Sequence, residues 1–471
     1  MKTYLKNAVK LAAFLALTAF LLAGLGQVMS IQKFQSNYYS SLSSFQGLYG
    51  LEENTLDVVF LGSSHGYNSY WPQQLYDEYG IRSYNLSTSM QGPIVSYYWL
   101  EETLKTQTPR AVVFEVCFLF HETDEPSLRK AFDPMRLSRT KINAAKDLYD
   151  YDPELFDPLS FVFPLIRFHE RWKEPQEVFF DPGSLADRNY LKGFYPGFGS
   201  MGEVEDYTFA ASTSMEMAED AGKEVPDNFA MTYLQRMTVL CEEKGIPLIL
   251  TSSPSTRWTG EQHNFTAEYA AAHSLTFYDF NCEDIYTAID YEIGSDNLDT
   301  GHPNLEGTSK ITAYLGERLS RDFGIGASED PQWEETKPYR DLVLEDYAVT
   351  RAYTLPEYLE AADKDRYTIY IVSDGGFKPS QESIGKLSQM GIAWHEDRPI
   401  CAVIGTEETV QAEDELIGTY GGGRYPFRLS VVNGKSSILL NRKEQSWGEE
   451  KHFHIAVYDS VFGSVVDTNA Y

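Results

Sequence analysis

The stretch DVVFLGSSHG (Asp57 to Gly66) decides the fold of this 471-residue chain. Its first half is a continuous apolar run that ends at Gly62, which is typical of a strand buried on both faces of a parallel sheet. Its second half is a turn of small residues that lifts a serine to the carboxyl edge of the sheet, where backbone N–H groups of a following helix can face an oxyanion. A Gly-Ser-Ser turn alone is also typical of a plain turn or a helix cap, so a catalytic interpretation needs a second motif.

On both sides of this stretch, apolar runs alternate with helix-like segments. The predicted strands are residues 57–61, 81–86, 111–119, 246–251 and 275–280. The predicted helices are residues 71–79, 94–107, 228–244, 266–273 and 308–321. Gly245 is expected to end the helix before it, and Asn304 and Gly307 are expected to cap the last helix. Strands that alternate with helices indicate an α/β fold whose parallel sheet is covered on both faces.

The rest of the chain divides into an insertion, a linker and a second domain. The first domain is predicted over residues 31–325, with an insertion at about 120–225 that would lie over the carboxyl edge of the sheet. Residues 326–345 are acidic and contain two prolines, which predicts a linker. Residues 346–471 are expected to form a smaller β-rich domain, with a hairpin turn at Asn433-Gly434. Its predicted strands are residues 368–372, 400–404, 429–432 and 454–458.

Residues 1–30 are expected to be a membrane anchor. The segment from Leu11 to Gly26 is apolar except for Thr18, and three lysines precede it. A run of this length can cross a bilayer, and its basic flank should stay in the cytoplasm, which places the rest of the chain outside the cell. The competing interpretation is a cleaved signal peptide with a small-residue site near Ala23, which gives the same side of the membrane. We favour an uncleaved anchor because the run is long and no clear cleavage motif follows.

Composition excludes some partners and cofactors. The chain has 39 Lys and Arg against 69 Asp and Glu, a net charge of -30, which disfavours binding to nucleic acid. The four cysteines are far apart and form no CxxC pair, so we expect neither a zinc cluster nor any other metal or cofactor. Buried thiols are favoured over disulfides. These cysteines are Cys117, Cys241, Cys282 and Cys401.

The second motif lies far downstream, where the chain reads DTGHPNLEG (Asp299 to Gly307) directly before the last predicted helix. Serine catalysis needs a base that takes the hydroxyl proton and a carboxylate that orients and stabilises the imidazole. A turn that carries Asp299 and His302 three residues apart can supply both groups from one rigid loop.

The two motifs together resemble the SGNH (GDSL-like) hydrolase superfamily over roughly Leu51 to Phe323. The resemblance implies a flavodoxin-like three-layer sandwich with a parallel sheet. The third residue of the first motif aligns with Ser64, which makes Ser64 the nucleophile rather than Ser63. It also makes His302 the base and Asp299 its orienting partner.

The chain departs from the pattern of this family at two oxyanion positions. The family has a glycine after the second strand, where the nearest equivalents here are Ser89 and Met90; with Gly62 these residues are the candidate oxyanion site. The family has an asparagine after the third strand, where this chain reads VFEVCFLFHE (residues 113–122). One donor is therefore missing or comes from elsewhere, and the loss of such a donor costs about 2.7–4 kcal/mol of barrier.

The closer resemblance is to membrane-anchored SGNH-like proteins that modify bacterial surface polymers, including the D-alanyl-teichoic-acid transfer protein and alginate-acetylation-like proteins. It implies acyl transfer, with acetyl as the expected group, onto a surface polysaccharide or related polymer, with an acylated carbohydrate as a candidate ligand. It also implies a membrane-bound O-acyltransferase as a candidate partner. About Thr354 to Tyr471 resembles the interleukin-like EMT inducer domain, which implies carbohydrate or protein binding.

Other polar and aromatic residues have competing interpretations. In RFHERW (Arg167 to Trp172), His169 and Arg171 are candidates for gripping a sugar or an acyl donor; the alternative is an ordinary helix surface. KGFYPGF (residues 192–198) is a candidate of the same kind. His65 is expected to have a local structural role, and Arg257 to lie at the site rim.

Three hypotheses for function remain open. The first is acyl transfer to a glycan hydroxyl through Ser64, His302 and Asp299. The second is an O-acetylesterase that uses the same triad with water as acceptor. The third is a glycan-binding surface protein that keeps the fold without catalysis, which the missing asparagine favours and the intact set of three residues disfavours.

Overall fold

The computed structural model describes residues 2–29, 41–122, 124–154, 156–163, 165–173, 189–202, 204, 222–405, 408–420, 423, 425–447 and 451–471. The chain divides into two compact units, the first ending at Lys337 and the second continuing from Pro338 to Tyr471. The predicted separation of an α/β region from a β-rich C-terminal region is confirmed.

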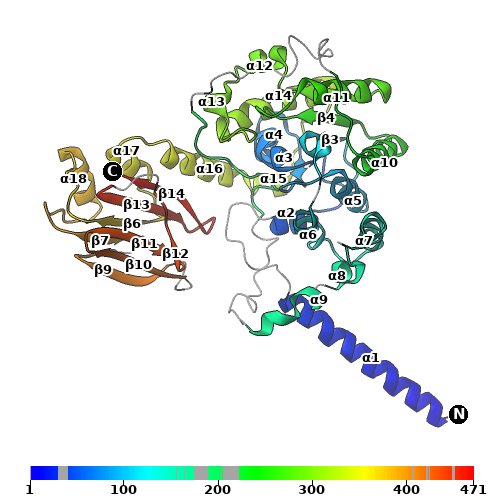
Figure 1. The fold of residues 1–471 in the computed structure, drawn as a ribbon, viewed down its shortest axis with the longest axis horizontal. Coiled ribbons are helices and arrows are strands. Elements are labelled where there is room, and N and C mark those ends of the chain that lie inside the picture. Colours follow the sequence, from blue (N-terminus) through cyan, green and yellow to red (C-terminus); the bar gives the residue numbers. More distant parts are fainter. Residues whose placement is uncertain are drawn as a thin grey trace. The chain divides into compact units, whose positions relative to one another are not determined.

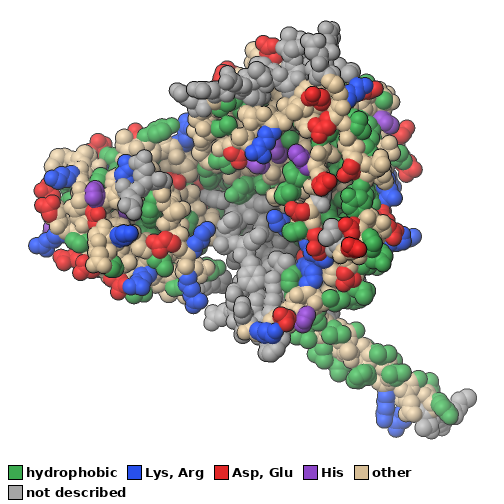
Figure 2. Space-filling model, in the orientation of Figure 1, with side chains coloured by type: hydrophobic (Ala, Val, Ile, Leu, Met, Phe, Trp, Pro, Cys, Tyr) green, Lys and Arg blue, Asp and Glu red, His purple; other side chains and the backbone are tan. Residues whose placement is uncertain are grey.

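The first element of the chain is a long apolar helix, α1 (Lys2–Met29). Hydrophobic side chains cover most of this helix, with basic side chains near its N-terminal end (Figure 2). The segment Tyr4–Gly26 is long and apolar enough to cross a membrane, although a signal sequence would meet the same criteria. The expected membrane-spanning length is therefore present at the N-terminus.

A five-stranded parallel sheet forms the centre of the first unit (Figure 1). Its order is β2-β1-β3-β4-β5, one of the two common orders of doubly wound sheets. The chain moves from β1 outward to β2 and then returns to β3 on the other side of β1, so the sheet reverses direction between β1 and β3. Ligands of such sheets bind beyond the carboxyl ends of the strands at this reversal point. The strands are β1 (Val58–Leu61), β2 (Ser83–Asn85), β3 (Ala111–Glu115), β4 (Leu248–Ser252) and β5 (Thr276–Asp279).

Side chains of the sheet pack in two separate hydrophobic cores, because successive residues of a strand point to opposite faces. Val59 and Leu61 pack in one core with residues of α5, α10 and α11. Val58 and Phe60 pack in the other core with residues of α4 and α14. The expected sheet with helices on both faces is thus confirmed. These helices are α4 (Pro72–Tyr79), α5 (Pro93–Thr103), α10 (Asn228–Lys244), α11 (Gly260–Ala272) and α14 (Leu305–Phe323).

The capped helix ends follow the sequence signals, whereas several other helix and strand ends differ from the prediction. Gly245 ends α10 in the left-handed region, with φ 66°, and Asn304 caps α14 by accepting from the N–H groups of Glu306 and Gly307. The helix predicted from residue 266 begins at Gly260, because Thr259 and Gln262 form a capping box there. The strand predicted over residues 111–119 ends at Glu115, and the chain continues as a short 3₁₀ helix, η1 (Cys117–Phe120).

The described parts of the insertion lie in two places. Its helical part contacts α1 through α9 and η2. Its later part, residues 189–202, crosses the carboxyl edge of the sheet: the Asn85 N–H donates to the Lys192 carbonyl, and the Tyr195 N–H donates to the Tyr67 carbonyl. This later part meets the expectation of a cap, and α6 of the helical part also reaches this edge, where the Ser127 hydroxyl lies 3.6 Å from Met90 Sδ. The helices are α6 (Glu125–Phe132), α7 (Arg139–Tyr151), α8 (Pro158–Val162), α9 (Leu165–Phe168) and η2 (His169–Lys173).

The predicted linker, residues 326–345, spans the boundary between the units but is largely helical. It contains α15 (Pro331–Glu334) and the start of α16 (Lys337–Thr350). Asp330 caps α15 and Pro331 occupies its first turn. This helix start was not predicted, because an acidic segment with prolines is also typical of a linker. Trp333 is fully buried in the first unit, where its ring lies beside Tyr76.

The second unit contains two antiparallel sheets and helices. Its sheet orders are β14-β13-β6-β7-β8 and β12-β11-β10-β9. One face of the five-stranded sheet packs on α17 and α18, and its other face packs on the four-stranded sheet. The predicted Asn433-Gly434 hairpin joins β10 to β11, with φ 52° and 73°, as a two-residue turn of type I′ requires. The elements are α17 (Leu355–Ala361), β6 (Tyr367–Ser373), α18 (Gln381–Gln389), β7 (Ile400–Ile404), β8 (Thr409–Ala412), β9 (Glu415–Tyr420), β10 (Tyr425–Val432), β11 (Lys435–Leu440), β12 (Lys443–Glu444), β13 (Phe453–Asp459) and β14 (Ser464–Ala470).

Arg366 is the main buried cation of the second unit's described part. Its guanidinium donates to Asp346 at 2.7 Å and to Asp459 at 2.6 Å, and both carboxylate side chains are fully buried. We expect Arg366→Met to lower the free energy of unfolding of this unit by about 3–5 kcal/mol, because two buried carboxylates lose their cation. Hydrogen exchange of β6 and β13 would measure the loss. Arg398→Met, which breaks the exposed pair with Glu413, should cost less than about 1 kcal/mol, and equal effects would contradict the prediction.

Candidate active site

The turn after β1 places two serines at the carboxyl edge of the sheet. Ser63 caps the short helix α3 (Ser64–Ser69), because its hydroxyl accepts from the His65 N–H at 3.3 Å. Gly62 has φ 147°, and a Cβ atom there would lie 2.7 Å from the Cβ of Glu115. Glycine is therefore required at the point where the chain leaves β1, and α3 begins directly against β3.

Asp299 and His302 lie in the loop before α14. The loop is closed by the Leu298 N–H, which donates to the His302 carbonyl at 2.8 Å. His302 Nδ1 lies 2.8 Å and 2.9 Å from the two carboxylate oxygens of Asp299. Burial alone would raise the pKa of Asp299, but the Gly301 N–H and the His302 contacts outweigh it and lower that pKa below its ordinary value. Asp299 is therefore an ionised partner of the imidazole.

The structure brings Ser64 to this pair. Ser64 Oγ lies 2.8 Å from His302 Nε2, although the two residues are 238 positions apart in the sequence. The Ser64 residue is 8% exposed, whereas the His302 and Asp299 side chains are 28% and 52% exposed. A serine hydroxyl, an imidazole and a carboxylate thus stand in one hydrogen-bonded chain, the arrangement that nucleophilic serine catalysis needs.

His65 packs beside the imidazole of His302. The two ring centroids are 5.0 Å apart, and a Cβ atom on Gly301 would lie 2.8 Å from His65 Cε1. Burial, and then the neighbouring His302, lower the pKa of His65 to about 3, so its ring is neutral at physiological pH. His65 therefore fills the space between α3 and the His302 loop.

The predicted oxyanion residues form a turn next to Ser64. The Thr88 N–H donates to the Gly62 carbonyl at 3.3 Å, and the Gln91 N–H donates to the Thr88 carbonyl at 3.1 Å, with Ser89 and Met90 between them. Met90 has φ 59°, the left-handed region that favours glycine. Strained backbone of this kind is concentrated at functional sites. Among the described residues, neither the Ser89 nor the Met90 N–H has a hydrogen-bond acceptor.

Tyr67 is a site residue that sequence reasoning missed. It lies three residues after Ser64 in α3, and its hydroxyl lies close enough to the Ser64 side chain for that side chain to lower the pKa of Tyr67. Burial raises the pKa of Tyr67 to about 12, so the hydroxyl keeps its proton and can donate. Its ring meets Tyr195 edge-on, with centroids 5.6 Å apart. The spacing of one helical turn from Ser64 was the only signal for Tyr67 in the sequence.

Glu115 is a second missed residue, at the end of β3. Its carboxyl is fully buried and accepts from the Ser63 hydroxyl at 3.1 Å and from the Cys117 N–H at 3.0 Å. Burial raises the pKa of Glu115 to about 7. Its sequence signal was a single acidic residue within the apolar run VVFEVCFLF (residues 112–120).

The other residues predicted to bind a ligand lie in different places. His169 is exposed on η2, its Nδ1 lies 2.8 Å from the Ile166 carbonyl, and η2 contacts α1, away from α3 (Figure 1). The side chain of Arg171 lies outside the described residues. Lys192 is buried with its ammonium over the Trp333 ring, 4.5 Å from the centroid. Arg257 lies close enough to His65 to help lower its pKa, consistent with a place at the rim.

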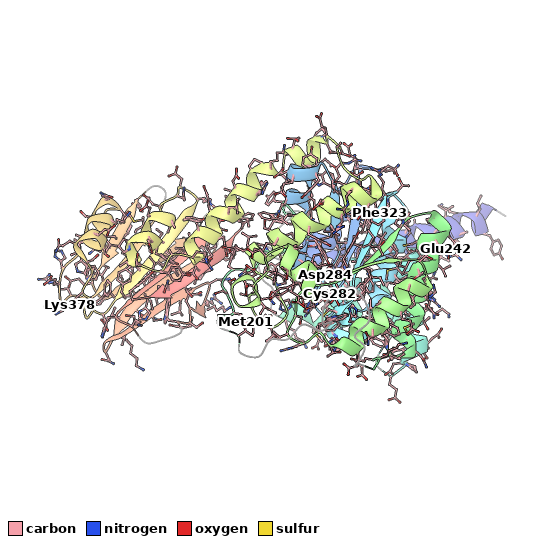
Figure 3. All side chains as sticks on the ribbon, turned by 90° about the horizontal axis from the view of Figure 1, so that it is seen from above. Met201, Glu242, Cys282, Asp284, Phe323 and Lys378 are labelled. Atoms are coloured by element: carbon pink, nitrogen blue, oxygen red, sulfur yellow. The ribbon has the colours of Figure 1, made fainter. Side chains whose placement is uncertain are left out.

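A second buried cluster of titratable groups lies after β5. Donor atoms of His263, Asp279 and Cys282 are close enough together to hold a metal ion. However, His263 Nδ1 lies 2.7 Å from Asp279 Oδ2, and the Asn281 N–H donates to Asp279 Oδ1 at 2.9 Å. These groups satisfy one another and hold the loop that precedes α12 (Glu283–Ala288), where Figure 3 labels Cys282. All four cysteines are buried free thiols.

No family model matches this sequence, and no curated protein matches it significantly. The function must therefore be inferred from the residues and geometry of the chain itself.

Proposed function

We propose that the first unit is an SGNH-type serine acyltransferase that moves an acyl group, acetyl in the simplest case, onto a hydroxyl of a cell-surface polysaccharide. The observation that carries this proposal is the chain from Ser64 Oγ through His302 to Asp299, with separations of 2.8 Å at both steps. The strand order and the position of Ser64 beyond the carboxyl end of β1 support the same class.

In the first half of the reaction, His302 Nε2 takes the hydroxyl proton as Ser64 Oγ attacks the acyl carbonyl of a donor ester. The tetrahedral intermediate collapses, the bond to the leaving alcohol breaks, and His302 gives its proton to that alcohol. In the second half, His302 takes a proton from the acceptor hydroxyl, whose oxygen attacks the acyl-serine. Ser64 then leaves and recovers its proton. Asp299 holds the imidazole in the required tautomer and stabilises its charged form.

The oxyanion of each tetrahedral intermediate needs hydrogen-bond donors. We assign this role to the backbone N–H groups of Ser64, Ser89 and Met90 and to the Tyr67 hydroxyl. Tyr67 would replace the family's asparagine, because it is a neutral donor within hydrogen-bond reach of Ser64. The left-handed conformation of Met90 would replace the family's glycine.

Tyr67→Phe tests this assignment. We expect turnover of a chromogenic acetyl ester to fall about 10²- to 10³-fold, because one oxyanion donor is removed while the ring packing remains. Tyr195→Phe, which changes the neighbouring tyrosine, is the matched control and should retain most activity. If the two variants have equal turnover, Tyr67 is not an oxyanion donor.

The remaining features suggest where the reaction takes place. An uncleaved α1 with its basic N-terminal flank would hold the units on the outer side of the cell membrane. A membrane-bound O-acyltransferase would supply the acyl donor there. We assign the second unit, with its resemblance to the interleukin-like EMT inducer domain, to carbohydrate or protein binding rather than catalysis.

The exposure of His302 and Asp299 favours a second candidate, an O-acetylesterase, because water can reach the imidazole. Full-length protein in detergent with an acetyl ester and increasing concentrations of a polysaccharide acceptor separates the two reactions. Transfer predicts acetylated polymer that increases at the expense of free acetate. Release of acetate alone, at all acceptor concentrations, would identify the esterase.

A further inference from the structure

The carboxyl of Glu115 lies under the turn that carries the candidate nucleophile. The Ser63 hydroxyl donates to Oε2, and the same hydroxyl accepts from the His65 N–H. The Cys117 N–H donates to Oε1. Gly62 packs directly on the Cβ of Glu115. Glu115 therefore contacts both the backbone at the start of the turn and the Ser63 side chain.

Glu115 connects three segments at the carboxyl edge of the sheet. The backbone N–H groups of Ser63 and Ser253 lie close enough to this carboxyl to lower its pKa, so the ends of β1 and β4 both face Glu115 on β3. Two hydrogen-bonded donors and two further N–H groups therefore face one carboxyl group. A carboxylate suits this place because it accepts only, whereas an amide would turn an N–H group toward some of these donors.

No cation balances this charge among the described residues. The titratable groups facing Glu115 are His65 on α3, Tyr70 after α3 and Cys117 on η1. His65 is neutral, and burial raises the pKa values of Tyr70 and Cys117, so these two groups carry no charge. A buried carboxylate without a cation destabilises a fold, and such groups are concentrated at functional sites.

We propose that Glu115 is a positioning residue that fixes the Ser63–Ser64 turn, and with it Ser64 Oγ, for attack on the acyl donor. This inference rests on the function proposed above. Glu115 acts through Ser63: its carboxylate orients the Ser63 hydroxyl, the hydroxyl caps α3 at His65, and the first residue of α3 is Ser64. Loss of the carboxylate would leave the triad side chains present but less well aligned.

The test uses full-length protein in detergent and compares wild type with Glu115→Gln. The first readout is the rate at which a fluorophosphonate labels Ser64 at about pH 8, where Glu115 is ionised. We expect Glu115→Gln to lower this rate about 10- to 100-fold, the size of effect that a small misplacement of reacting groups produces. The matched control is Asp57→Asn, a buried carboxylate that pairs with Arg82 at the opposite end of β1 and should leave the rate unchanged.

The second readout is the dependence of Tm on pH, which distinguishes positioning from a stabilising role. The pKa of Glu115 is raised in the folded state, so its protonated form stabilises the fold, and this stabilisation is lost as pH rises from about 4.5 through about 7. Glutamine does not titrate. The Tm of Glu115→Gln relative to wild type should therefore rise between about pH 5 and pH 8 while its labelling stays slow.

A second variant, Ser63→Ala, removes the hydroxyl that connects Glu115 to α3 and leaves the carboxyl in place. It should slow labelling of Ser64 by a similar factor. The double variant with Glu115→Gln should be labelled little more slowly than either single variant. If wild type is labelled at Ser64 and both variants are labelled as fast, Glu115 does not position the nucleophile, although the proposed function stands. If wild type is not labelled at Ser64, the proposed function and the positioning role both fail.

Discussion

Ser64→Ala is expected to lower turnover of an acetyl ester by about 10⁴- to 10⁶-fold, because it removes the atom that the proposed mechanism acylates. Any residual rate would come from substrate binding and oxyanion donors alone. The fold should be unaffected, since the hydrogen bond that is lost joins Ser64 to His302 within the candidate site itself. Steady-state kinetics with a Tm measurement for each variant would check both statements.

Ser63→Ala should be measured beside Ser64→Ala, because the Gly-Ser-Ser motif contains two serines that could be the nucleophile. Ser63 donates to Glu115 and caps α3, so its loss should slow the reaction only through the geometry of Ser64. A reaction lost in Ser63→Ala and kept in Ser64→Ala would reverse the assignment of the nucleophile.

Asp299→Asn has the second largest expected effect, a decrease of about 10⁴-fold in kcat. The amide would turn an N–H group toward His302 Nδ1, which favours the tautomer that carries its proton on Nε2. That tautomer cannot accept the proton of Ser64. Glu306→Gln removes an exposed charge from the first turn of α14 and serves as the control, with turnover close to that of wild type. If Asp299→Asn keeps wild-type kcat, Asp299 does not orient the base.

Much of the first unit's fold was predictable, because the apolar runs and the helix-ending residues in its sequence agree with the way its strands and helices pack. The apolar run 58–61 is buried on both faces, as its composition indicated, and Gly245 ends α10 at the expected residue. The end of β3 was not predictable, because the apolar run continues through Cys117 into η1, and both strands and 3₁₀ helices accept buried apolar residues. The position of Glu115 at the edge of the sheet was concealed for the same reason.

In the second unit, the buried strands were predictable and the exposed ones were not. β6 and β13 are almost wholly buried and read as apolar runs. β9 alternates exposed and half-buried residues, and β12 has only two residues, so their assignment depends on pairing with neighbours. The helix α15 escaped prediction because its acidic, proline-containing sequence is also typical of a linker.

Some residues of the candidate site were also predictable from the sequence, and others were not. The pairing of Asp299 with His302 was predictable because it depends on local spacing in one loop, and the resemblance to the SGNH family pointed to Ser64. Tyr67 and Glu115 depend on how α3 packs against residues distant in sequence, which no local pattern records. His169 was selected by residue type alone, and its segment contacts α1 rather than the sheet edge.

The central claim is that Ser64 becomes acylated. The most direct test incubates full-length protein in detergent with an activated acetyl ester, quenches it in acid, and maps the modification by mass spectrometry of proteolytic peptides. The account predicts one acetyl group on the peptide that contains Ser64, increased when the acceptor is withheld and absent from Ser64→Ala. An unmodified Ser64 under conditions of ester turnover, or an acetyl group that persists in Ser64→Ala, would contradict it.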